Sequence, residues 1–217
     1  MVLTFLLSSK SAVLGLVLSV ATLHFLTSYV DAAERGFVRS LLETRQKAVV
    51  VQSWDLSCGA AALTTLLNYQ HRDMVGEKEV ALGLIAQKRY VENPSLLRLR
   101  HGFSLFDLKR YVDARGYRGI GFGQMELEDL VERAPIMVPI TSNGYKHFVV
   151  FRGRMGNRVL LADPAYGNRT MLAGKFERSW IDYGGSIGKV GFVVARKDGP
   201  AEPNDLAPRP EEFLTLR

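Results

Sequence analysis

Apolar residues recur every three or four positions through much of the segment from 33 to 115, a spacing that puts them on one face of a helix. The pattern predicts a short lead-in helix or packing arm, followed by three further helices, over residues 33–47, 58–68, 77–87 and 104–115. Gly116 suits the end of the last helix. Ser104 and Asp107 have the spacing of a capping box at its start.

After Gly116 the chain changes to short runs of β-branched and aromatic residues, which are typical of strands. The Gly/Asn-rich segment 152–157 predicts a turn that joins two of these runs into a β-hairpin. Helices first and antiparallel strands second indicate an α+β fold for residues 48–197. We expect strands over 117–122, 136–140, 147–151, 158–164 and 190–195, with a short helix over 126–133.

The two ends of the chain differ from this domain. Lys10 is followed by a long apolar run, and Ala32 lies among small residues that resemble a cleavage site, so residues 1–32 are predicted to be a secretory signal peptide. An uncleaved membrane anchor is the alternative, because the run approaches the length of a membrane span. Either segment implies export to the periplasm. Four of the eight prolines lie beyond residue 197, which predicts a flexible, solvated tail over 198–217.

The composition limits the kinds of functional site that the chain can carry. The 217 residues are 47% hydrophobic and 23% charged, which is ordinary for a globular protein. A single cysteine excludes an internal disulfide framework, and with four scattered histidines it predicts no Cys/His zinc site and no metal or cofactor. The net charge of +6 weakly favours acidic partners or a membrane surface, but the basic residues are spread along the chain, so no nucleic-acid binding is expected.

The single cysteine, Cys58, lies where a polar loop meets the start of a predicted helix. A free thiol in an oxidising compartment is a liability unless it is buried or used. A helix N-terminus favours the thiolate, which is the nucleophilic form, and Gly59 leaves room for a substrate backbone. Six residues before the thiol, Gln52 carries an amide that can donate to an oxyanion formed beside Cys58.

A general base is expected on the later hairpin. His147 begins one predicted strand and Asp163 ends its partner strand. Because the start of one antiparallel strand lies beside the end of the other, Asp163 can reach the ring of His147 and hold the tautomer that accepts the Cys58 proton.

Each of these residues also has a purely structural interpretation. A cysteine at a helix start is often a small buried hydrophobe, a histidine that opens a strand is often structural, and Asp163-Pro164 is a common turn signal. Their joint occurrence, with Gln52 before the cysteine, favours catalysis. Two further histidines, His71 and His101, lie in charged segments and are expected to face solvent.

The order of these motifs resembles the double-glycine leader peptidases, which are papain-like cysteine peptidases found fused to bacteriocin-exporting ABC transporters and as stand-alone exported proteins. The resemblance extends over residues 50–195 and is carried by Gln52, Cys58-Gly59-Ala60-Ala61, His147-Phe148-Val149-Val150 and Ala162-Asp163-Pro164-Ala165. It implies a papain-like fold with N-terminal helices packed on a C-terminal antiparallel sheet. It also implies Cys58 as nucleophile, His147 as general base and acid, Asp163 as orienting carboxylate and Gln52 as oxyanion donor.

The chain departs from this family in two respects. Many relatives carry Asp before the nucleophile, where this chain has Ser57, and the transporter fusions have membrane-spanning and nucleotide-binding regions that this sequence lacks, including a Walker A motif. The chain therefore resembles the stand-alone exported branch, which includes the peptidase of bacterial functional-amyloid (Fap) secretion systems.

The resemblance implies an exported cysteine endopeptidase that cleaves a peptide or protein, such as a leader or a secretion-system component. Its expected partners are this substrate and a secretion-system or amyloid-biogenesis protein, with membrane contact only through an uncleaved N-terminal segment. Two alternatives stay open. The chain could be a non-catalytic peptide-binding or chaperone-like module that uses the same groove, or its thioester intermediate could pass the acyl group to an amine instead of water.

Overall fold

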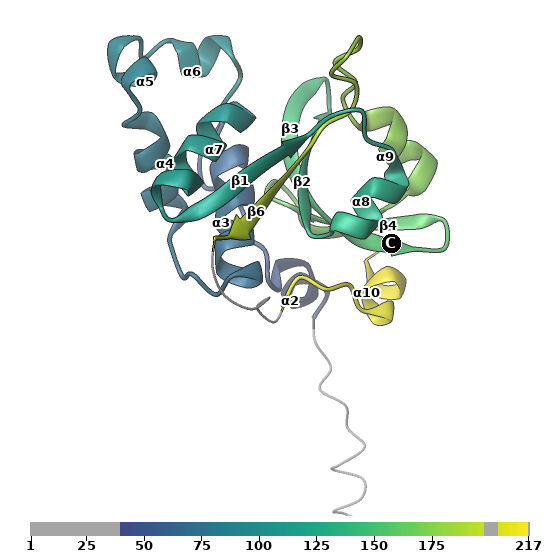
Figure 1. Ribbon diagram of the computed structural model, residues 1–217. Coiled ribbons are helices and arrows are strands. Elements are labelled where there is room, and N and C mark those ends of the chain that lie inside the picture. Colours follow the sequence, from purple (N-terminus) through teal and green to yellow (C-terminus); the bar gives the residue numbers. More distant parts are fainter. Residues whose placement is uncertain (1–39, 198–203, 217) are drawn as a thin grey trace, which may run out of the picture. The chain divides into compact units, whose positions relative to one another are not determined.

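An antiparallel sheet of six strands forms the centre of the computed structural model, which describes residues 40–197 and 204–216. The strands lie in the order β1-β6-β2-β3-β4-β5 (Figure 1). Helices from the first half of the chain pack on one side of this sheet. The strands are β1 (Tyr117–Phe122), β2 (Ile136–Ser142), β3 (Tyr145–Met155), β4 (Arg158–Asp163), β5 (Gly167–Leu172) and β6 (Gly191–Arg196).

The helices of the described residues are mostly short. Those that matter for the site are α3, which is buried along nearly its whole length, and α4 and α7, which pack beside it. Their bounds are α2 (Leu41–Gln46), α3 (Cys58–Gln70), α4 (Glu77–Ile85), α5 (Lys88–Glu92), α6 (Leu96–Leu99), α7 (Leu105–Ala114), α8 (Leu127–Arg133), α9 (Ala173–Ser179) and α10 (Pro210–Thr215). In the described part of the chain, none of these helices combines the length and hydrophobicity needed to cross a membrane.

Alternation along the strands produces a hydrophobic core on each face of the sheet. Met137 and Val150 pack with Leu63 and Leu66 of α3 in one core. The neighbouring strand positions, such as Val149, pack in the other core with side chains of α8 and α9. Helices therefore cover both faces, as Figure 1 shows for α3 on one side and for α8 and α9 on the other.

Small residues let α3 approach the sheet closely. Ala60, Ala61 and Ala62 are fully buried, and a Cβ added to Gly59 would lie 3.3 Å from the Phe148 ring. The first turn of α3 thus lies against β3, with Cys58 as the first residue of the helix.

The predicted α+β order is confirmed, as are most of its elements. Helix α7 begins with the expected capping box, in which the Asp107 backbone N–H donates to Ser104 Oγ (3.3 Å) and the Ser104 backbone N–H donates to Asp107 Oδ2 (2.9 Å). The hairpin also forms, but β3 runs on to Met155, so the segment predicted to be a turn is mostly strand. A register shift between Phe151 and Gly153 accommodates this extension.

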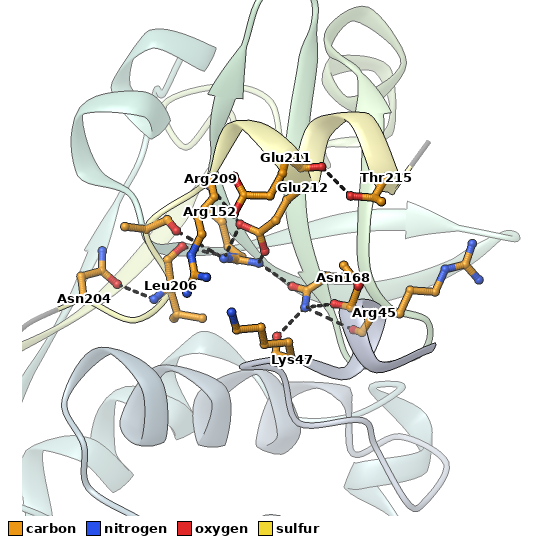
Figure 2. A network of polar contacts seen from close by, with 12 residues as sticks. Arg45, Lys47, Arg152, Asn168, Asn204, Leu206, Arg209, Glu211, Glu212 and Thr215 are labelled. Atoms are coloured by element: carbon orange, nitrogen blue, oxygen red, sulfur yellow. Dashed lines mark hydrogen bonds and ion pairs between the residues drawn. The ribbon is translucent and has the colours of Figure 1, made fainter. Parts of the chain in front are cut away.

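The prediction of a solvated tail is wrong for residues 204–216. Helix α10 packs its Phe213 against Leu160 of the sheet, and Leu206 is fully buried. The guanidinium of Arg152, only 2% exposed, forms an ion pair with Glu212 of α10 (2.8 Å). Figure 2 shows this network from close by. Proline content indicated a flexible segment, but apolar side chains and a buried ion pair hold it on the domain.

The other end of the chain is described only from residue 40 onward. Helix α2 lies inside the predicted lead-in helix over 33–47 and contacts β5. Asn168 of β5 donates from Nδ2 to the backbone carbonyls of Arg45 and Lys47 (Figure 2). The predicted signal peptide over 1–32 lies outside the described residues, as do 198–203 of the predicted tail.

Candidate active site

Three of the predicted site residues meet at the N-terminus of α3. Cys58 is the first residue of that helix, His147 is the third residue of β3 and Asp163 is the last residue of β4. His147 Nε2 lies 2.7 Å from Asp163 Oδ1, and Cys58 lies close enough to the ring to raise the pKa of His147. Because Nε2 binds the carboxylate, Nδ1 is the nitrogen that remains for the sulfur.

The β3–β4 hairpin brings His147 and Asp163 together as the sequence pattern indicated. Val150 pairs with Ala162, so the start of β3 lies beside the end of β4. The contact between α3 and β3 then brings Cys58 to the imidazole. Two independent features of the chain, a hairpin and a helix start, thus build one cluster.

Asp163 is fully buried and its carboxylate is well supplied with donors. Oδ1 accepts from His147 and from the Ala165 backbone N–H (2.9 Å), and Oδ2 accepts from Arg169 Nε (2.7 Å). Burial alone would raise the pKa of this carboxyl, but the hydrogen bond and charge of His147 and the charge of Arg169 hold it below its usual value. Asp163 is therefore a carboxylate at neutral pH.

His147 is held as a cation over a wide pH range. Burial disfavours the imidazolium, but the hydrogen bond to Asp163 and the interactions with the charges of Asp163 and Cys58 outweigh burial and raise the pKa of His147 to about 9. A protonated imidazole beside a sulfur and a carboxylate can both stabilise a thiolate and donate a proton to a leaving group.

A backbone hydrogen bond holds Gln52 beside the same site. Its N–H donates to the carbonyl of Pro164 (2.8 Å), the residue after Asp163, and its side chain lines a hollow together with Cys58. The side-chain Nε2 donates to the Trp54 carbonyl (3.1 Å), while Oε1 is buried and has no hydrogen-bond partner among the described residues. Since an amide NH2 has two hydrogens, one remains for an oxyanion.

The loop before Cys58 is held by Glu77, a residue that sequence reasoning missed. The Glu77 carboxylate accepts from the Ser57 hydroxyl (2.6 Å) and from the Ser53 backbone N–H (3.0 Å). A carboxylate from α4 thus lies beside Ser57, the residue that precedes Cys58. No spacing in the sequence pairs Glu77 with this loop, because the contact depends on how α4 packs beside α3.

Two hollows adjoin at the pair Cys58 and His147. One has a volume of about 620 Å³ and a mostly apolar wall, with Arg100 and Lys146 among its lining and without an acidic side chain. The other has a volume of about 570 Å³ and a more polar wall that includes Gln52, Asn143 and Tyr166. An extended peptide can therefore pass across the thiol from one hollow to the other.

The two other histidines of the described residues have different surroundings. His71 is buried and its Nε2 lies 2.9 Å from the Val194 carbonyl, so the expectation that it faces solvent is wrong. His101 is exposed and lines both hollows. Over residues 40–197 and 204–216, no group of three or more His, Cys, Asp or Glu side chains is placed to hold a metal ion.

The sequence of this chain matches a known protein family. The model of the Peptidase C39 family matches residues 46–184, which include all four predicted site residues. Over 145 residues the chain is 37% identical to the "Probable functional amyloid protease FapD" of Pseudomonas aeruginosa, and over 143 residues it is 34% identical to the protein of the same name in Pseudomonas fluorescens. Each alignment covers 66% of this chain and 61% of the relative, so the chain spans about three fifths of the length of the curated relatives it matches.

Solved structures confirm the predicted papain-like α+β fold. A double-glycine motif protease from an AMS/PCAT transporter, solved in complex with the leader peptide, superposes with a TM-score of 0.53 at 23% identity, covering 71% of this chain and 96% of that one. The peptidase domain of Streptococcus ComA, a bi-functional ABC transporter, also gives a TM-score of 0.53, at 14% identity, covering 69% of this chain and 98% of that domain.

Proposed function

Because the chain belongs to the Peptidase C39 family, we propose that it is an exported cysteine endopeptidase with Cys58 as its nucleophile. The observation that carries the proposal is the position of the His147 ring. The ring lies beside Cys58 and is hydrogen-bonded to the Asp163 carboxylate, at the place where two hollows adjoin. A structural histidine needs neither a thiol partner nor a cleft.

In the proposed reaction, the Cys58 thiolate attacks the carbonyl carbon of a peptide bond. The oxyanion binds the Cys58 backbone N–H, which as a first-turn donor has no acceptor within α3, and the free N–H of the Gln52 side chain. The His147 imidazolium gives its proton to the leaving amine, which leaves a thioester on Cys58. A water then loses a proton to neutral His147 and attacks the thioester, which releases the acid and restores the ion pair.

Asp163 stays ionised throughout and keeps Nε2 of His147 engaged, so that Nδ1 points toward the thiol. The Asp163 carboxylate is suited to this role because it is buried and accepts hydrogen bonds on both oxygens, which stabilise its ionised form. Its function is orientation and stabilisation of the imidazolium, as in other triads.

The substrate we propose is a peptide or protein of a functional-amyloid secretion system. The names of the two Pseudomonas relatives support this assignment, and the predicted signal peptide over 1–32 supports export to the periplasm. A leader segment and a secretion-system component both fit a site that an extended chain can cross.

The test compares purified wild type with C58A and H147Q on a peptide library, with products read by mass spectrometry. We expect cleavage by wild type, none by C58A and a loss of at least a hundredfold in H147Q. H101Q is the matched control for the loss of an imidazole, because His101 lines the same hollows but takes no part in the network; we expect its kcat to stay close to that of wild type, with any effect confined to KM.

The same experiment separates the alternatives. Persistent cleavage by C58A would contradict the proposed mechanism, and binding without cleavage by wild type would support a peptide-binding module instead. Product masses decide between hydrolysis, which adds water to the acyl fragment, and acyl transfer, which adds an amine.

A further inference from the structure

Arg169 lies on the far side of the Asp163 carboxylate from His147. Its Nε donates to Oδ2 at 2.7 Å, and its side chain is 25% exposed while Asp163 is fully buried. Neither the motifs of the sequence nor the roles assigned above include this arginine. It nevertheless completes a chain of contacts that runs from Cys58 through His147 and Asp163.

The sheet register explains why Arg169 reaches this carboxylate. In the antiparallel β4–β5 pair, Asp163 is opposite Gly167 and Leu161 is opposite Arg169. Arg169 is therefore the diagonal neighbour of Asp163, two residues along the strand on the same face. Gly167 between them has no side chain that could compete for the carboxylate.

The two carboxylate oxygens of Asp163 have different partners. Oδ1 accepts from His147 and from the Ala165 backbone N–H, whereas Oδ2 accepts from Arg169. The hydrogen bond from Arg169 therefore limits rotation of the Asp163 carboxylate. The positive charge of Arg169 also offsets part of the carboxylate's negative charge, which would otherwise act on the imidazolium alone.

Arg169 is itself held in place by an aromatic side chain. Its guanidinium lies over the Tyr166 ring, 5.3 Å from the centroid. The Tyr166 hydroxyl accepts a hydrogen bond from Asn143 Nδ2 (2.9 Å) in the turn between β2 and β3. The arginine is thus anchored to the wall of the more polar hollow, beside the site rather than in solvent.

We propose that Arg169 is a positioning residue that orients the Asp163 carboxylate and limits how strongly that carboxylate holds the proton on His147. The proposal rests on the function proposed above. With Arg169, the ionised cluster of thiolate, imidazolium, carboxylate and guanidinium is neutral. Without it, the buried cluster carries one net negative charge.

The sign of the expected effect follows from the charges around His147. Cys58 of α3 and Asp163 of β4 stabilise the imidazolium, and Arg169 of β5 opposes it as a like charge. Loss of the guanidinium therefore raises the pKa of His147. The Ala165 N–H still holds Oδ1 in that case, so the carboxylate stays bonded to the ring.

The other charged or titratable groups that line the two hollows beside this ring are Asp55, Arg100, His101, Tyr145, Lys146, Tyr166 and Tyr183. All of them are unchanged in the variants below.

The experiment titrates His147 by NMR in the full chain labelled with ¹⁵N-histidine, which contains four histidines, with H147Q to assign the signal. The expected wild-type midpoint is about pH 9. R169Q keeps a donor but loses the charge, and we expect its midpoint to rise by about one pH unit and its kcat to fall about tenfold with KM unchanged. R169K keeps the charge and should hold the wild-type midpoint and a kcat within threefold of wild type.

R158Q is the matched control. It removes an arginine from the same pair of strands, but Arg158 donates to Thr170 and touches no carboxylate of the site, so the His147 midpoint should not move. A wild-type midpoint in R169Q would overturn the proposal. If R169Q does not fold, R169K decides, because a shifted midpoint or a large loss of kcat in folded R169K contradicts a role based on charge.

The titration needs no substrate, so it separates this proposal from the proposed function. A wild-type His147 midpoint at or below 6.5 would contradict the ion pair itself, whatever Arg169 does. Cleavage that persists in C58A would contradict the peptidase mechanism, while a shifted midpoint in R169Q would still support the role of Arg169.

Discussion

His147 shows how a single side chain can depend on contacts far apart in the sequence. Its ring is buried between Cys58 of α3 and Asp163 of β4, and these two groups raise its pKa to about 9 in spite of burial. The same contacts that would serve catalysis therefore also contribute to folding stability, because the imidazolium forms them only in the folded chain.

This coupling predicts a pH dependence of stability. The pKa of His147 rises from 6.5 to about 9 on folding, so its stabilisation is complete below pH 6.5 and is lost as the pH rises through 9. The free energy of unfolding of wild type should fall by about 3 kcal/mol more than that of H147Q between pH 6 and pH 10. Urea unfolding of both proteins across this range checks the prediction, and parallel curves would contradict it.

The contacts of Glu77 predict a second effect on stability. E77A leaves the buried Ser57 hydroxyl and the Ser53 N–H without the carboxylate that accepts from them. We expect a loss of about 2 kcal/mol in the free energy of unfolding and slower cleavage, since the loop leads directly into Cys58. E79A on the same helix is the control. Glu79 is 57% exposed and paired with Arg115, so its loss should cost less than about 1 kcal/mol. Equal effects would show that the Glu77 contacts contribute nothing specific.

The sequence predicted best those helices and strands whose characteristic residues lie close together in the chain. The β3–β4 hairpin and the capped helix α7 each carry their signals within one continuous stretch of the chain, and both form. Strand β5 was missed because its sequence Gly-Asn-Arg-Thr-Met-Leu alternates poorly, with buried Asn168 and Thr170 bonded to distant parts of the chain. Arg169 lies on that strand, so its contact with Asp163 could not be inferred without the β4–β5 register.

The contact between α2 and β5 yields a test of backbone geometry. Gly167 has a φ of +76°, and a Cβ there would lie 2.5 Å from the Arg45 carbonyl oxygen. We expect G167A to lower the free energy of unfolding by about 3 kcal/mol, from backbone strain and displacement of the neighbouring chain. G156A is the control, because Gly156 also has a positive φ but open space around it, and it should cost about 1 kcal/mol. Equal losses would mean that the chain near Arg45 moves away freely.

Within the described domain, the segment at Arg45 and Lys47 and the segment 204–216 are both fastened to strands β3 to β5. Arg152 of β3 binds Glu212 of α10 and the side chain of Asn168, which in turn binds the carbonyls of Arg45 and Lys47 (Figure 2). The strands involved, β3 to β5, are those that carry His147, Asp163 and Arg169. The C-terminal segment 204–216 is therefore part of the structure that supports the site.

Removal of one partner of this buried ion pair should be costly. E212A leaves the buried guanidinium of Arg152 without its carboxylate, and we expect a loss of about 3 kcal/mol in the free energy of unfolding, read from urea denaturation. E211A is the control, because the neighbouring Glu211 side chain is exposed, and its loss should be within about 0.5 kcal/mol of wild type. If E212A is as stable as E211A, the C-terminal segment is not fastened by this pair.

The proposed pairing of Cys58 with His147 is tested by the rate at which iodoacetamide alkylates Cys58 between pH 5 and pH 10, in wild type, H147Q and H101Q. An ordinary thiol reacts appreciably only as the pH approaches about 8.5. If the His147 imidazole holds the proton of Cys58, wild type and H101Q react rapidly at pH 6 to 7, whereas H147Q reacts there at least tenfold more slowly. Identical profiles for wild type and H147Q would show that sulfur and imidazole do not act together, and the proposed mechanism would fail.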